Sequence, residues 1–266
     1  MYWQKRLDRV NPNQELEDKI TEIRKEHKDF GYRRVCGELR NKGIKANKKR
    51  VQRIMQKLDF QVTSFTRKSR KYSSYKGNIG KIAPNRINRR FNTSVPHQKI
   101  TTDTTEFKYY EINNKGGMVI KKLYLDPFLD MFNGEILSYS ITKIPSAAGI
   151  LSAQKQAIEI TSDCPYRRTF HSDRGWAYQM SAYSSVLREN KIFQSMSRKG
   201  NCYDNSVMEN FLGILKQEMY YGTTYYSFDE LKQAIEKYIK YYNEKRIKEK
   251  LGWMSPVQYR LNILAA

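Results

Sequence analysis

Apolar residues recur at helical spacing in the first part of the chain. They do so over residues 15–27 and again in a second helix that carries Val35 and Leu39, which Gly43 is placed to end. Asn47 can cap a third helix, in which residues 48–58 combine an apolar stripe with basic side chains. The order of helix, glycine turn and basic helix predicts a helical, helix-turn-helix-like domain over residues 1–60.

From residue 100 the pattern changes to that of a mixed α/β domain. Residues 100–110 are rich in Thr, Phe and Tyr, and strands over 122–132 and 135–142 are joined by Asn133-Gly134, a strong hairpin signal. The elements then alternate as helix 146–160, strand 168–172, helix 180–190, strand 193–196 and helix 206–221. This is the order of a ribonuclease-H-like core, a five-stranded mixed sheet flanked by helices, which we assign to residues 98–226.

Two segments lie outside these domains. Residues 61–97 are poor in apolar periodicity and rich in Lys, Arg, Ser and Asn, so we predict a basic linker. Residues 227–266 form a predicted C-terminal helical segment that packs on the core through Leu251, Trp253, Val257 and Tyr259.

The charge of the chain indicates a polyanionic partner. Its 266 residues include 49 Lys and Arg against 27 Asp and Glu, which gives a net charge of +22. Residues 41–90 alone hold 16 basic residues and one acid, Asp59. A solvated basic linker would explain this run, but its place directly before the core favours contact with nucleic acid.

Cysteine and histidine usage gives no sign of a disulfide framework or a zinc site. Cys36, Cys164 and Cys202 are scattered without a Cys-x-x-Cys pair, and no His pair has metal-site spacing. The first residues form no apolar signal core, and no run approaches the ~20 apolar residues of a membrane span. We therefore expect a cytoplasmic protein with no membrane partner.

Three carboxylates are the candidates for chemistry. Asp103 lies within the first predicted strand, Asp173 closes the fourth, and Glu209 lies on the late helix. In a ribonuclease-H-like sheet these positions converge. Carboxylate oxygens are the hard donors that Mg²⁺ prefers, so the set predicts a magnesium site for phosphoryl chemistry.

Each carboxylate also has a structural explanation. Asp103 could be a polar strand-end residue, and Asp173 before Arg-Gly could form a turn. Glu209 fits a capping box with Ser206, in which a glutamate satisfies backbone donors at a helix start. Two further acids on the second predicted strand, Asp126 and Asp130, are the leading rivals for a catalytic role.

The local sequences around these acids resemble those of a known family. The segments are Thr-Thr-Asp103-Thr-Thr-Glu106-Phe, His171-Ser-Asp173-Arg-Gly175, Asn201-Cys-Tyr-Asp204-Asn205-Ser-Val-Met-Glu209 and, in the helical domain, Phe30-Gly-Tyr-Arg-Arg-Val. They resemble bacterial insertion-sequence transposases that have a retroviral-integrase-like core and are encoded in a second reading frame. The resemblance extends from about residue 30 to residue 259.

The resemblance implies an activity and a catalytic set. Asp103, Asp173 and Glu209 would hold two Mg²⁺ ions, with Mn²⁺ as a possible substitute, for cleavage at the element's ends and strand transfer. His171 accompanies the second acid in the family, and the pair Asp204-Asn205 precedes the third, so these three residues are expected to support the site.

DNA at the element's ends and at the target is the implied partner. Lys216 lies seven residues after Glu209, two helical turns along the same face, where it could meet a phosphate or a flanking base. The other predicted DNA contacts are Arg33, Arg34, Lys48, Lys49, Arg50, Arg53, Arg89, Arg90 and Arg246. The family also implies a homo-oligomer on DNA and possible fusion to an upstream-frame product.

Two other functions remain open from the sequence. One is a ribonuclease-H-like nuclease or resolvase that only hydrolyses DNA. The other is a non-catalytic regulator that binds DNA through the helix-turn-helix and the basic linker. The intact carboxylate set disfavours the regulator, and the transposase-like layout of the basic arm and closing segment disfavours simple hydrolysis.

Overall fold

The described residues belong to two compact units. The computed structural model describes residues 11–62, 80–112 and 116–265. One unit, here the helical unit, groups the described part of Met1–Arg67 with Ile247–Met254. The other, here the core unit, groups the described part of Lys68–Arg246 with Ser255–Ala266.

The helical unit contains α2 (Gln14–Glu26), α3 (Tyr32–Asn41) and α4 (Lys48–Lys57). Asn47 caps α4 as predicted, because its side-chain oxygen accepts a hydrogen bond of 2.8 Å from the backbone N–H of Lys49. The apolar stripes of the helices meet in one cluster, made of Leu16, Ile20, Ile23, Phe30, Val35, Leu39, Val51, Ile54, Met55, Ile247 and Trp253.

The prediction that Trp253 packs on the catalytic core is wrong, because this side chain belongs to the helical unit's cluster. A Cβ added at Gly37 would lie 2.3 Å from the Trp253 ring, so only glycine allows this approach. The Nδ2 of Asn41 donates a hydrogen bond of 3.0 Å to the carbonyl oxygen of Trp253. Tyr259, in contrast, belongs to the core unit and packs against Phe132 there.

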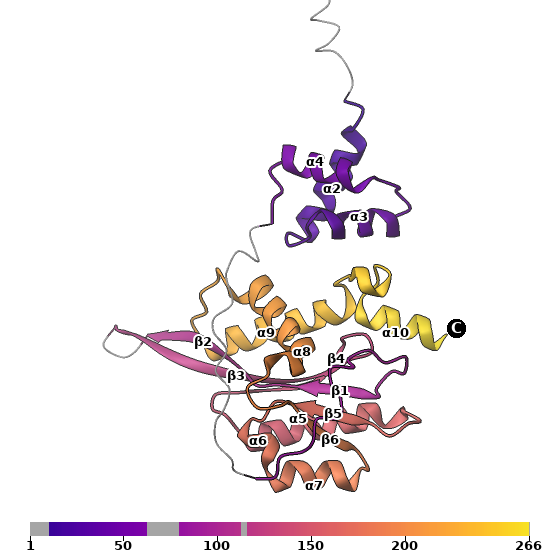
Figure 1. The fold of residues 1–266 in the computed structure, drawn as a ribbon. Helices are drawn as coiled ribbons and strands as arrows, with labels where there is room; N and C mark the ends of the chain where they lie inside the picture. Colours follow the sequence, from indigo (N-terminus) through magenta and orange to yellow (C-terminus); the bar gives the residue numbers. More distant parts are fainter. Residues whose placement is uncertain (1–10, 63–79, 113–115, 266) are drawn as a thin grey trace, which may run out of the picture. The chain divides into compact units, whose positions relative to one another are not determined.

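A mixed sheet forms the centre of the core unit (Figure 1). Its strands are β1 (Lys99–Thr102), β2 (Thr105–Ile112), β3 (Met118–Asp130), β4 (Ile136–Thr142), β5 (Thr169–Ser172) and β6 (Phe193–Met196). The strands lie side by side in the order β4-β3-β1-β5-β6, and β2 pairs with β3 on the same edge as β1. The pairs of β3 with its neighbours are antiparallel, whereas β1-β5 and β5-β6 are parallel.

The sheet has six strands rather than five because the first predicted strand is divided. β1 and β2 lie end to end along the same edge of β3, where Thr102 pairs with Phe128 and Thr105 with Leu125. Asp103 and Thr104 leave the ladder between them. Asp103 therefore stands at an interruption of the strand, not in its middle.

Helices cover both faces of the sheet (Figure 1). On one face, α8 (Ser206–Leu215) and α9 (Phe228–Glu244) pack on side chains that include Phe107, Leu123 and Leu125. On the other, α5 (Ala147–Ile160), α6 (Trp176–Gln179) and α7 (Ser181–Glu189) pack around Ile100, Phe128 and Phe170. The last helix is α10 (Pro256–Leu264), and short 3-10 turns at η1 (Thr161–Asp163), η2 (Cys202–Asn205) and η4 (Glu249–Leu251) complete the chain.

The predicted ribonuclease-H-like fold with an N-terminal helical domain is confirmed, with two local differences. The helix predicted over 206–221 changes after Leu215 into a π-helical segment, η3 (Lys216–Tyr220). The described end of the predicted linker, residues 80–97, lies on the core: Ile87 is buried, and the backbone N–H of Arg86 donates to Ser195 Oγ at 2.9 Å. Residues 63–79 lie outside the described part.

Within the described part of the chain, we find no helix with the length and apolar character needed to cross a bilayer.

Candidate active site

Asp103 is held at the break between β1 and β2. Its Oδ1 accepts a hydrogen bond of 2.8 Å from the backbone N–H of Thr104, which turns the carboxylate back over the interruption. Thr102, the last residue of β1, is buried, whereas Asp103 is half-buried. The break therefore brings a carboxylate out of the sheet at the end of β1.

Asp173 follows the end of β5, the strand parallel to β1. Its Oδ1 accepts a hydrogen bond of 2.7 Å from the backbone N–H of Gly175. A Cβ at Gly175 would lie 2.9 Å from that oxygen and 3.2 Å from the Tyr178 ring, so the glycine permits the tight turn. The predicted turn-forming role of Asp173 is real, and it fixes the carboxylate at the same sheet edge as Asp103.

Glu209 lies in the first turn of α8, and the capping box that would give it a purely structural role is not formed. α8 begins at Ser206, so Ser206 is inside the helix rather than at its cap, and the capping residue Asn205 makes no side-chain cap hydrogen bond. The predicted capping box between Ser206 and Glu209 is therefore wrong. The half-buried carboxylate is not engaged at the helix start.

The electrostatics show that the three carboxylates are neighbours. Burial raises the pKa of Asp103 well above its ordinary value, and the charges of Asp173 and Glu209 raise it further. Burial also raises the pKa of Asp173 and, together with the charge of Asp173, that of Glu209. Three distant parts of the chain thus place mutually repelling acids in one shielded region.

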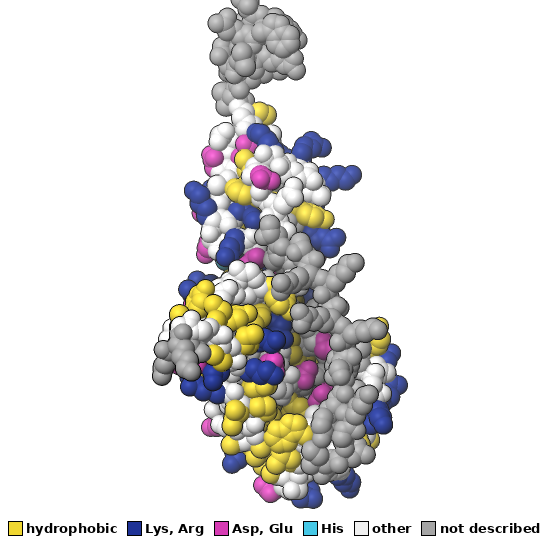
Figure 2. All heavy atoms as spheres, turned by 90° about the vertical axis from the view of Figure 1, so that its left-hand side faces the viewer, with side chains coloured by type: hydrophobic (Ala, Val, Ile, Leu, Met, Phe, Trp, Pro, Cys, Tyr) yellow, Lys and Arg dark blue, Asp and Glu magenta, His cyan; other side chains and the backbone are white. Residues whose placement is uncertain are grey.

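The chemistry of these donors, although not their present arrangement, suits a divalent cation. Carboxylate oxygens are the hard ligands that Mg²⁺ takes, and a cation would relieve the repulsion that raises these pKa values. Among the described residues, no group of three or more His, Cys, Asp or Glu side chains is gathered as a ready-made metal site. Figure 2 shows acidic side chains on one face of the core unit with basic side chains beside them.

Lys216 is the cation beside this site. It stands at the junction of α8 and η3, and the charges of Asp103 and Glu106 favour its protonated form, although burial lowers its pKa overall. Its Nζ lies 5.1 Å from the centre of the Phe107 ring. The predicted position two turns after Glu209 is thus close to Asp103, and its contact with DNA stays a prediction.

Sequence reasoning missed a buried network behind Asp103. The hydroxyl of Thr104 donates to Asp126 Oδ1 at 2.6 Å, and the hydroxyl of Ser140 donates to Asp126 Oδ2 at 2.8 Å. The phenol of Tyr178 lies 3.3 Å from the Thr104 hydroxyl. Asp126 is therefore a buried acceptor that holds the strand break rather than an exposed rival ligand.

Asp130, the second rival, is also used structurally. Its carboxylate accepts backbone N–H groups of His97 at 2.8 Å and of Phe132 at 3.0 Å. Burial raises its pKa to about 6. Its role is to hold the segment just before β1 against the turn that follows β3.

Asp204 and Asn205 anchor the start of α8. Buried Asp204 accepts hydrogen bonds from the guanidinium groups of Arg198 and Arg89 and from the side-chain amide of Asn85. These partners, Arg198 first, hold the pKa of Asp204 well below its usual range. Asn205 accepts from the Thr101 hydroxyl and donates to the Thr102 carbonyl at 3.1 Å. The pair thus joins the helix of Glu209 to the strand that leads to Asp103.

We expect Asn205→Ala to lower kcat for DNA cleavage by about 10- to 100-fold, as loss of a residue that orients a ligand does. The Michaelis constant for DNA should stay within about twofold, since Asn205 is buried and touches β1 rather than solvent. Steady-state cleavage kinetics measure both. A rise in the Michaelis constant with unchanged kcat would contradict the positioning role.

His171 is a satisfied core histidine and not a phosphate contact. It is fully buried, with Nδ1 2.9 Å from Ser195 Oγ and Nε2 3.2 Å from Ser197 Oγ. Burial lowers its pKa to about 4, so the ring is neutral at physiological pH. It supports the site by joining β5 to the strand and loop that lead toward η2.

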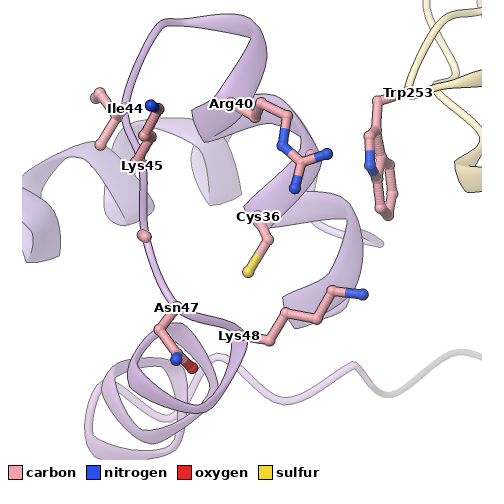
Figure 3. Close-up of a pocket in the computed structure, with 9 residues that line it drawn as sticks. Cys36, Arg40, Ile44, Lys45, Asn47, Lys48 and Trp253 are labelled. Carbon is pink, nitrogen blue, oxygen red and sulfur yellow. The ribbon is translucent and has the colours of Figure 1, made fainter.

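The predicted DNA contacts of the helical unit are exposed apart from Arg34, which is half-buried. Figure 3 shows Arg40 and Lys48 extending above and below Cys36 toward Trp253, around a cavity of about 230 Å³. Four of these predicted contacts already have protein partners: Lys48 pairs with Glu249 at 3.2 Å, Arg50 donates to Asn13 at 2.7 Å, and Arg33 and Arg34 donate to Tyr32 and Asp29. Contact of this basic face with DNA stays a prediction.

Two of the arginines predicted to bind DNA from the core unit, Arg89 and Arg246, form ion pairs within the protein. Arg89, though half-exposed, is held by Asp204 at 3.1 Å, whereas Arg90 is exposed. Arg246 is only 3% exposed, and its guanidinium forms two hydrogen bonds with Glu218, at 2.7 and 2.8 Å. The prediction that Arg246 binds DNA is wrong, because its donors face a buried carboxylate.

Models of known families match three parts of the chain. Residues 94–202 and 209–264 match two models that are both described as an integrase core domain. Residues 12–69 match a model described as an HTH-like domain. A solved structure of the HTLV-2 integrase catalytic core domain in complex with magnesium overlays on 62% of this chain and 97% of its own, with 20% identity and a TM-score of 0.45.

Relatives extend over most of the chain. A transposase-like protein of Haemophilus influenzae is 46% identical over 221 residues, 83% of this chain and 96% of its own. The InsK protein of insertion sequence element IS150 in Escherichia coli is 39% identical over 261 residues, 97% of this chain and 87% of its own. A transposase of insertion sequence element IS904 in Lactococcus lactis is 32% identical and spans 92% of both chains. With an integrase core and an HTH-like domain in the same order, the chain belongs to the IS3 family of insertion-sequence transposases.

Proposed function

We propose that the chain catalyses cleavage at the ends of an insertion sequence and transfer of the freed 3′ strand to target DNA. The observation that carries this proposal is the convergence of Asp103, Asp173 and Glu209, in which the charges of Asp173 and Glu209 raise the pKa of Asp103 and the charge of Asp173 raises that of Glu209. Their positions after β1, after β5 and on α8 suit a site that opens at one sheet edge. Family membership supports the reaction class.

The three carboxylates would hold two Mg²⁺ ions, for which Mn²⁺ could substitute. Bound there, divalent ions supply activation of the attacking water or 3′-hydroxyl and stabilisation of the leaving oxygen. The protein's own part is positioning. Thr104 and Gly175 orient the two aspartates by backbone hydrogen bonds, and Asn205 fixes the helix of Glu209 against β1.

The proposed partners are the DNA of the element's ends and of the target. A net charge of +22 supports binding to both through the release of counterions. Lys216 would meet the DNA nearest the carboxylates, and the basic face of the helical unit would bind it elsewhere. We place the activity in a homo-oligomer on bacterial DNA in the cytoplasm, with the chain alone or fused to an upstream-frame product.

One assay separates the candidate functions. Purified protein, Mg²⁺ and labelled DNA from the element's end should yield both nicked and joined products on a gel. Nicking without joining would identify a nuclease or resolvase instead, and binding without either product a regulator.

The pH dependence should report the shared charge of the site. Because the pKa of Asp103 is raised, its carboxyl group stays protonated up to a higher pH than usual. The bound proton then competes with the metal for the carboxylate oxygens. Activity should therefore fall as pH drops through the raised pKa. A tenfold increase in Mg²⁺ should move this acid limb to lower pH, by about one unit if binding displaces one proton and by less if it displaces more. Cleavage rates between pH 5 and 8 at two Mg²⁺ concentrations measure the shift, and an acid limb that ignores Mg²⁺ contradicts it.

A further inference from the structure

A cavity lined by basic residues lies at the opposite end of β5 from the candidate catalytic carboxylates. The cavity, of about 360 Å³, opens where β5 and β6 begin, lined by Cys164, Tyr166, Arg167, Arg168, Asn190 and Lys191. Asp173 follows the other end of β5, five residues after Arg168, which corresponds to about 16 Å of extended chain. The cavity is therefore separate from the catalytic edge.

The cations of this cavity are held in place by the protein. The guanidinium of Arg167 lies 3.6 Å from the centre of the Phe193 ring, and its Nε donates to the Lys191 carbonyl at 2.9 Å. Arg86, which does not line the cavity itself, contacts the same ring at 4.2 Å. Arginines fixed on an aromatic ring lose less side-chain freedom when they bind an anion.

These cations have no carboxylate partner. Among the described residues, none of Arg86, Arg167, Arg168 and Lys191 forms an ion pair with Asp or Glu. Arg168 donates only to neutral oxygens, the Ile158 carbonyl at 2.6 Å and the Thr161 hydroxyl at 2.8 Å. The carboxylate whose charge acts on Arg168 is Asp163, which already contacts His97 at 2.6 Å. An uncompensated group of cations around a cavity favours an anion.

The geometry points to this cavity as a binding site for the phosphodiester backbone of a DNA segment remote from the phosphate being cut. Guanidinium groups match phosphate oxygens by paired hydrogen bonds, and the Tyr166 ring, 59% exposed, can lie against a sugar or base. This inference rests on the proposed function. The cavity would bind, on the core unit, a second stretch of the same DNA or a second DNA.

Charge reversal tests the site in the intact chain. We expect Arg167→Glu/Lys191→Glu to weaken binding of a 40-base-pair duplex about tenfold and to lower the salt dependence of binding by about two counterions. In the cleavage assay the Michaelis constant should rise about tenfold and kcat should stay within twofold. The charge-conserving Arg167→Lys/Lys191→Arg should keep wild-type affinity, and unchanged melting temperatures show that each variant is folded.

A matched control separates local from overall charge. Lys237→Glu/Lys240→Glu makes the same change in charge at exposed positions of α9, on another part of the core unit. It should weaken binding no more than about twofold. Equal losses in both double variants would overturn the inference. Failure of the proposed function itself would be separate, because it would show as absent nicking and joining in the wild type.

The rate at which Cys164 is alkylated measures directly whether the cavity is occupied, because Cys164 lines it. The half-buried thiol should react with iodoacetamide at least about fivefold more slowly when the 40-base-pair duplex is bound, with each cysteine followed by peptide mapping. Protection by millimolar inorganic phosphate together with DNA supports a phosphate site. Protection by phosphate but not by DNA, or by an acidic protein but not by DNA, contradicts the proposed partner.

Discussion

Asp103→Asn should abolish DNA cleavage and joining while making the protein more stable. The substitution removes a charged metal ligand, so we expect a loss of at least about three orders of magnitude in the cleavage rate, roughly 4 kcal/mol of transition-state stabilisation. Single-turnover cleavage of labelled end DNA measures it.

The gain in stability follows from the sign of the pKa shift. Burial and neighbouring acids raise the pKa of Asp103 in the folded protein, so the unfolded chain releases this proton at lower pH. Stability is therefore lost as pH rises from the ordinary pKa of an aspartate through the raised pKa of Asp103, and the wild type carries this penalty above the ordinary value. An uncharged amide carries none, and the melting temperature should rise by about 2–4 °C for each kcal/mol relieved.

The control is Asp229→Asn, an exposed acid in the first turn of α9. It should leave cleavage within twofold and should not raise the melting temperature. Adding Mg²⁺ should stabilise the wild type more than Asp103→Asn. A variant at Asp103 that cleaves normally, or that melts at a lower temperature at neutral pH, would contradict the account of the site.

Arg246→Met should destabilise the core unit by about 3–5 kcal/mol, as removal of one partner from a buried ion pair does. Both side chains of the pair are almost fully buried, and Glu218 would lose both guanidinium hydrogen bonds while keeping the one from the Tyr238 hydroxyl, 2.8 Å away. The expected drop in melting temperature is on the order of 10 °C. Thermal unfolding followed by circular dichroism measures it.

A second substitution identifies the cause. If the loss comes from a stranded carboxylate, Arg246→Met/Glu218→Gln should recover a large part of the stability. If Arg246 instead bound DNA, Arg246→Met would melt like the wild type and would lower the salt dependence of DNA affinity. That pair of results would show that Arg246 binds DNA.

Periodicity predicted the elements that bury a continuous apolar face. α5, α7 and β6 match their predicted ranges within one or two residues, because their apolar side chains repeat at the period of the element. Asn47 and Gly43 also acted as expected, since capping and positive backbone angles depend on local chemistry. Local rules are sufficient where local interactions decide.

Tertiary contacts decided the remainder. The break at Asp103 is fixed by Thr104 reaching Asp126 on another strand, which no local pattern encodes. Arg246 looked like a surface cation because its partner Glu218 is 28 residues away in sequence. The candidate catalytic set was predicted from three local sequences and the order of elements, while the hydrogen bonds around it, such as that of Asn205 to β1, required the fold.

The most direct test of the central claim is a titration with Mn²⁺, whose binding to the protein–DNA complex can be followed by electron paramagnetic resonance. The account predicts that the wild type binds Mn²⁺ and that Asp103→Asn, Asp173→Asn and Glu209→Gln each weaken this binding at least about tenfold. Asp126→Asn, which leaves all three ligands in place, should weaken it less. Equal Mn²⁺ affinity in the wild type and all three ligand variants would show that these carboxylates do not form one metal site.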